Sequence, residues 1–102
     1  MTMFEFIRDS INSDSPELDI PKHISEVSVM YRLFAGRSDI DIYASVKDDV
    51  IGFSILSEKE DDARSLKQML NGSHYTAYGS TFAIQAKTYK NTVHIAMNRE
   101  GS

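Results

Sequence analysis

The sequence contains no cysteine and no tryptophan, and it has only two prolines among its 102 residues. The absence of cysteine excludes disulfides, thiolate nucleophiles and cysteine-ligated zinc, and it fits a reducing compartment. No apolar run approaches the roughly 18 residues that a transmembrane helix needs. These absences predict a cytoplasmic protein with no membrane partner.

The motifs of common enzyme families are also missing. The chain has no G-x-S-x-G, no G-x-x-x-x-G-K-[ST] and no G-x-G-x-x-G. The histidines, His23, His74 and His94, have no partner close in the sequence. Asp39 and Asp41 would share one face of a strand and could hold a divalent ion, but solubilising that face is the simpler role. We therefore predict no enzymatic activity, no metal and no cofactor.

The composition is that of a folded domain with an uneven distribution of charge. Hydrophobic residues make up 41% and charged residues 25%, and the length indicates one domain over residues 1–102. The net charge is −4, yet all acidic residues except Glu100 lie within residues 1–62. Such asymmetry can mark an interaction surface, although folding can also mix the two halves.

Two segments have the pattern of helices. Residues 2–13 begin with a Thr2–Glu5 capping-box spacing, and their apolar residues share one stripe. Residues 58–71 follow Ser57, which has the same spacing to Glu60, and carboxylates fill the first turn, where the helix dipole favours them. The expected buried stripe of this second helix consists of Ala63, Leu66, Met69 and Leu70.

The other segments have the period of strands or of loops. Apolar and polar residues alternate in the first two segments of residues 27–56, and the third segment, residues 50–56, is apolar on both faces, as in an interior strand. The interruptions at "AGRS" and "KDD" then predict a three-stranded meander. Residues 75–98 predict a hairpin, and residues 14–23, with two prolines, predict a loop. The expected fold is α+β, a mostly antiparallel five-stranded sheet in the order α-β-β-β-α-β-β with two helices packed on one face.

A small acidic chain without catalytic motifs suits a protein-binding module. Inhibitors, immunity proteins and phage anti-defence factors are of this kind, and their acidic surfaces occupy basic surfaces of other proteins. Tyr43, beside the acidic residues, could be an aromatic anchor. The predicted partner-binding residues are Asp39, Asp41, Tyr43, Asp48, Asp49, Glu58, Glu60, Asp61 and Asp62.

Nucleic-acid binding by the last third of the chain is the alternative. Basic and aromatic residues there could combine phosphate neutralisation with base stacking. The residues that would do so are Tyr75, Tyr78, Lys87, Tyr89, Lys90 and Arg99. A homodimer is a further option, because a small sheet can leave an edge strand unpaired.

Overall fold

The computed structural model describes residues 1–13 and 19–100, and in that part of the chain it has three helices and a six-stranded mixed sheet. The elements follow the order α-β-α-β-β-α-β-β-β. Their bounds are α1 Met3–Ser10, β1 Ile11–Ser13, α2 Ile24–Phe34, β2 Ile40–Lys47, β3 Val50–Ser57, α3 Glu60–Leu70, β4 His74–Ala77, β5 Ser80–Tyr89 and β6 Thr92–Glu100.

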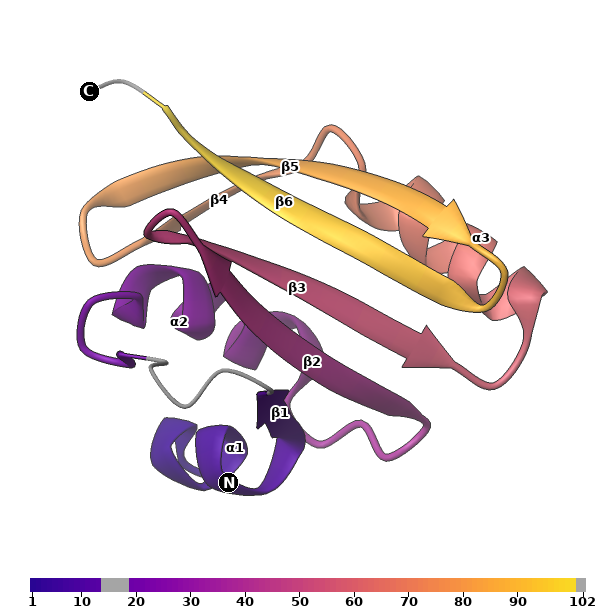
Figure 1. Ribbon diagram of the computed structural model, residues 1–102, viewed down its shortest axis with the longest axis horizontal. Coiled ribbons are helices and arrows are strands. Elements are labelled where there is room, and N and C mark those ends of the chain that lie inside the picture. Colours follow the sequence, from indigo (N-terminus) through magenta and orange to yellow (C-terminus); the bar gives the residue numbers. More distant parts are fainter. Residues whose placement is uncertain (14–18, 101–102) are drawn as a thin grey trace.

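The strands lie side by side in the order β1-β2-β3-β6-β5-β4 (Figure 1). β1 pairs with β2 in parallel, and every other pairing is antiparallel. The α+β class is therefore confirmed, but the sheet has one strand more than expected and is mixed, and there is a third helix. Residues 14–18 of the predicted loop 14–23 lie outside the described residues.

Alternation along the strands gives the sheet one buried face and one open face. Phe53, Ile55 and Ile95 lie on the buried face, which α2 and α3 cover with Val27, Met30, Phe34, Ala63, Leu66 and Leu70. The side chains between them point to the open face, which no helix of the described residues covers and which exposes Tyr43, Lys87 and His94.

The segment expected to be the first strand of the meander is the helix α2. Val27, Val29, Tyr31 and Leu33 alternate, but Val27, Met30 and Phe34 also lie on one helical face, and these three are buried. The chain leaves this helix through Gly36, whose φ of +85° is a conformation suited to glycine. The remaining strands of the meander, β2 and β3, form the expected hairpin, with Asp48 and Asp49 in its turn.

Both predicted helices exist, with shorter bounds. In α1 the Thr2 hydroxyl accepts a hydrogen bond from the Glu5 amide at 3.1 Å, as the capping-box spacing predicts, but the helix stops at Ser10 and residues 11–13 pair with β2. In α3 the expected Ser57 cap is wrong, because Ser57 is the last residue of β3 and Lys59 occupies the cap position without a side-chain bond.

Two further expectations need correction. Met69 is 55% exposed and does not belong to the buried stripe of α3. The predicted hairpin over residues 75–98 is a three-stranded unit, because β4 adds to β5 as an edge strand through a turn at Tyr78-Gly79. Within the described part of the chain, no helix has the length and apolar character needed to cross a membrane.

Candidate functional site

The β2–β3 hairpin separates the predicted acidic residues into two groups. Asp48 and Asp49 occupy its turn, whereas Asp39 and Asp41 lie where β2 begins, beside the end of β3. An eight-residue strand spans roughly 23 Å at 3.3 Å per residue step, so the two groups lie at opposite ends of the hairpin and do not form one cluster. The group at the start of β2 continues into α3, and we call it the acidic end; it comprises Asp39, Asp41, Glu58, Glu60, Asp61 and Asp62.

Arginines neutralise only part of the acidic end. Arg37 donates two hydrogen bonds to Asp39, at 3.0 and 2.6 Å, and this guanidinium holds the pKa of Asp39 below its usual range. Arg64 pairs with Asp61 and lies 3.8 Å from Glu60. Among residues 1–13 and 19–100, no cation lies within 4.0 Å of Asp41, Glu58 or Asp62, although Arg37 interacts electrostatically with Asp62 over a longer distance.

Folding brings some positive charge to the same end of the sheet. The β5–β6 turn is joined to the end of β3, because Ser57 donates its amide to the Asn91 carbonyl at 2.9 Å and Asn91 donates its side-chain amide to the Ser57 carbonyl at 2.7 Å. Lys90 of that turn lies over the Tyr89 ring at 5.5 Å. The charge asymmetry of the sequence is therefore reduced in the fold, although carboxylates still outnumber cations there.

Asp41 and Tyr43 are two residues apart on the open face of β2, and Tyr43 is 41% exposed. Strand register places Tyr43 opposite Ser54, Ser54 opposite His94, and His94 opposite Lys87. The Ser54 hydroxyl oxygen lies 3.1 Å from Nδ1 of His94. The open face thus joins Tyr43, from the predicted protein-binding set, to Lys87, from the predicted nucleic-acid-binding set.

The predicted nucleic-acid-binding residues do not form one surface. Lys87, Tyr89 and Lys90 lie near the β5–β6 turn, whereas Tyr78 lies in the β4–β5 turn at the other end of β5. Tyr75 pairs with Phe82 and packs against the core, and Arg99 points into the covered face.

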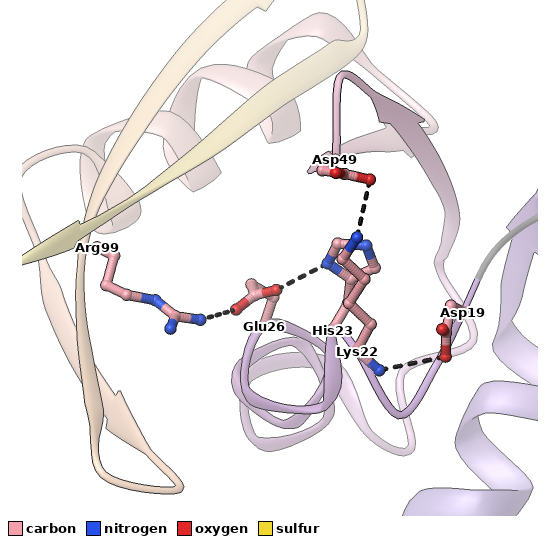
Figure 2. A network of polar contacts seen from close by, with 6 residues as sticks. All are labelled: Asp19, Lys22, His23, Glu26, Asp49 and Arg99. Carbon is pink, nitrogen blue, oxygen red and sulfur yellow. Dashed lines mark hydrogen bonds and ion pairs between the residues drawn. The ribbon is translucent and has the colours of Figure 1, made fainter.

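Sequence reasoning missed a polar network at the far end of the hairpin, shown in Figure 2. Glu26 and His23 are buried, with 6% and 5% exposure, and Nδ1 of His23 lies 3.2 Å from the Glu26 carboxylate. Arg99 donates to the other Glu26 oxygen at 3.1 Å. Lys22 pairs with Asp49 at 2.8 Å, which lowers the pKa of Asp49.

This network has a structural explanation. The buried carboxylate of Glu26 has a partner on each oxygen, as buried polar groups require. The Glu26–Arg99 pair attaches the start of α2 to β6. The Lys22–Asp49 pair attaches the residues just before α2 to the β2–β3 turn (Figure 2). The spacing of His23 and Glu26 would have predicted their contact if the segment had been recognised as a helix.

The described residues contain no candidate metal site, and no related protein was found for the chain. In residues 1–13 and 19–100, no three His, Cys, Asp or Glu side chains lie close enough to share a metal ion. Comparison with known proteins found no family model that matches the chain, no curated protein with significant similarity and no solved structure with a significant match.

Proposed function

We propose that this protein is a non-enzymatic binding module that occupies a basic surface of another protein with its acidic end and the adjoining open face of β2. The observation that supports this best is that Asp41, Glu58 and Asp62, at one end of the sheet, have no cation within salt-bridge distance in the described chain, and that Asp41 shares the open face of β2 with the exposed ring of Tyr43. Such a module acts as an inhibitor-like protein of the immunity or phage anti-defence type.

The carboxylates and the tyrosine contribute to binding in different ways. Unpaired carboxylates on one end of a small protein attract a basic partner and orient it during encounter. A half-exposed tyrosine supplies apolar area at small conformational cost and is among the residues that most often dominate binding energy. Asp48 and Asp49 lie outside this surface, so they make no direct contact in the proposed complex.

Nucleic-acid binding is the second candidate, and the cross-strand row of Tyr43, His94 and Lys87 favours it. An aromatic ring for stacking and a cation for phosphate contact lie in line on an open sheet face. The protein-binding proposal is preferred because the other basic and aromatic residues predicted for this role are dispersed.

The proposal is tested by affinity capture from the source cell followed by titration of the purified partner. The test variant is Asp41→Asn/Glu58→Gln/Asp62→Asn, and the matched control is Asp48→Asn, which removes a carboxylate from the far end. We expect the triple variant to weaken binding by about 100-fold, because each lost interaction with a cation contributes about 1 kcal/mol or more. We expect the control to bind normally.

Two results would contradict the proposal. One is a basic partner that binds the triple variant and the unmodified protein equally well. The other is a salt-sensitive gel shift with nucleic acid that disappears in Lys87→Gln, which would establish the second candidate instead.

A further inference from the structure

A cavity of about 270 Å³ lies at the acidic end, between α3 and the adjoining ends of β2 and β3. Its lining includes Arg37, Asp39, Ser57, Glu58, Asp62 and Met69. Pockets for drug-sized molecules usually measure about 300–1,000 Å³. The cavity lies near the lower end of that range and has room for one long side chain.

The polar wall of the cavity favours a cation. It contains three carboxylates and one guanidinium, and that guanidinium, on Arg37, is already bonded to Asp39. Glu58 and Asp62 line the same cavity and have no ion-pair partner in the described chain. A cation entering there would therefore meet Glu58 and also Asp62, which interacts with Arg37 only at longer range.

Ser57 gives a second, independent reason to expect a ligand. The residue is 3% exposed, and among the described residues its hydroxyl is the buried side-chain group without a hydrogen-bond partner. Alternation along β3 places its side chain on the covered face, the side on which α3 and the cavity lie. A buried hydroxyl without a partner is uncommon in native proteins, and a donor in the cavity would satisfy it after a small shift of the Ser57 side chain.

Apart from Ser65, the remaining wall is apolar. Ile40, Leu66 and Met69 line the cavity, and Met69 is 55% exposed although it belongs to a helix whose neighbouring apolar residues are buried. A lysine or arginine side chain carries an aliphatic stem below its charged head, and such stems commonly pack along apolar surface. Methionine adapts its shape to an incoming group because its side chain is unbranched and flexible.

We propose that this cavity receives one lysine or arginine side chain of the partner protein, with the stem against Leu66 and Met69 and the head near Glu58, Asp62 and the Ser57 hydroxyl. This inference deepens the proposed function and rests on it. It specifies the cavity as the place where the basic partner is recognised.

The test uses short capped peptides as probes. Ac-Gly-Arg-Gly-amide and Ac-Gly-Lys-Gly-amide are titrated into isotope-labelled protein and followed by amide chemical shifts, with a norleucine peptide as the uncharged control. We expect saturable, salt-sensitive shifts at Ser57, Glu58, Asp62 and Leu66 with the two cationic peptides and not with norleucine. Equal responses to all three peptides, or shifts spread over the whole surface, would overturn the proposal.

Variants then assign the individual groups. Glu58→Gln/Asp62→Asn should weaken peptide binding by about 10-fold or more, since two charge-assisted contacts are lost. Ser57→Ala should weaken it by about 3-fold, as expected for one neutral hydrogen bond. Asp48→Asn, at the far end of the hairpin, should leave it unchanged. Unchanged binding by the double variant would remove the cavity from consideration.

The experiment separates this inference from the proposed function. If the peptides bind in the cavity but no basic protein binds the chain, the cavity assignment stands and the proposed function fails. If a basic partner binds and Glu58→Gln/Asp62→Asn has no effect on its affinity, the proposed function stands and the cavity assignment fails.

Discussion

The two ends of the β2–β3 hairpin use charged residues in opposite ways. At the turn, the Glu26 carboxylate is buried and has a partner on each oxygen, His23 and Arg99. At the acidic end, Glu58 and Asp62 are exposed without a salt bridge in the described chain, and the buried Ser57 hydroxyl has no hydrogen-bond partner there. Burial and hydrogen-bond or ion-pair partners, more than residue type, therefore distinguish charged groups that stabilise the fold from those that are available to a ligand.

The largest expected effect comes from breaking the buried network. Glu26→Ala removes the shared partner of His23 and Arg99 and should lower the free energy of unfolding by about 2–3 kcal/mol. The value lies at the low end for buried pairs because Arg99 is 57% exposed. Urea unfolding followed by circular dichroism measures it, with Glu58→Ala as the control at the acidic end, expected within about 0.5 kcal/mol of the unmodified protein. Equal losses in the two variants would erase the proposed difference between the ends.

Ser57→Ala should change the free energy of unfolding in the opposite direction. Removing a buried hydroxyl that has no partner should raise the free energy of unfolding by about 1 kcal/mol, while it weakens binding of the arginine peptide. Ser54→Ala is the control, because the Ser54 hydroxyl already contacts His94 and its removal should bring no gain. A Ser57→Ala protein that is less stable would mean that this hydroxyl contributes to the fold.

The turns at either end of β5 allow a smaller test. Tyr78 and Lys90 adopt positive φ values of 51° and 55°, which side chains other than Gly and Asn rarely favour. Tyr78→Asn creates an Asn-Gly turn and should raise the free energy of unfolding by about 0.5–1 kcal/mol in the same urea assay. Lys90→Asn should give a similar gain in the free energy of unfolding if the positive φ alone determines it. A loss on Tyr78→Asn would show that the tyrosine ring contributes more than the turn costs.

The smallest effect concerns the exposed ion pairs of the two ends. Arg37 lowers the pKa of Asp39, and Lys22 lowers that of Asp49. A carboxyl group with a lowered folded-state pKa stabilises the fold above its unfolded-state pKa, near 3.9, and that contribution is lost as the pH falls through the folded-state value. Arg37→Gln should therefore raise the pKa of Asp39, leave Asp49 unchanged and reduce the acid sensitivity of stability.

An NMR titration of the carboxyl carbons measures both groups in one experiment, and Lys22→Gln is the reciprocal control that should affect Asp49 alone. An Asp39 pKa that stays low in Arg37→Gln would show that another group supplies the interaction. Added salt should diminish both shifts, since the pairs are exposed.

The elements that could be predicted are those with one clear period and local pairing. β2, β5 and β6 alternate, β3 is a short apolar run, and these strands pair in two hairpins through short turns, so their pattern survives in the fold. Helix α2 was missed because it is buried on more than one side: it faces the sheet with Val27 and Met30 and contacts α1 through Tyr31 and Phe6. A wide apolar surface obscures the helical period and leaves an apparent alternation.

The missed contacts are those between residues distant in sequence. Strand β1 has three residues, and it exists because Ile11 pairs with Ile42. Glu26 meets Arg99 across 73 positions, which no local pattern indicates. The acidic residues could be selected as candidates by type, but only the fold shows that Asp48 and Asp49 lie apart from the others.

The lengths of the outer strands have a consequence for how the molecule behaves at high concentration. Within the described chain, the sheet is bounded by β1 with three residues and β4 with four, whereas the strands between them have eight to ten. A copy that approaches either boundary finds only a brief ladder of free amides and carbonyls. The strands β3 and β6 have a neighbouring strand on both sides, so growth of fibrils by strand addition cannot start from either of them.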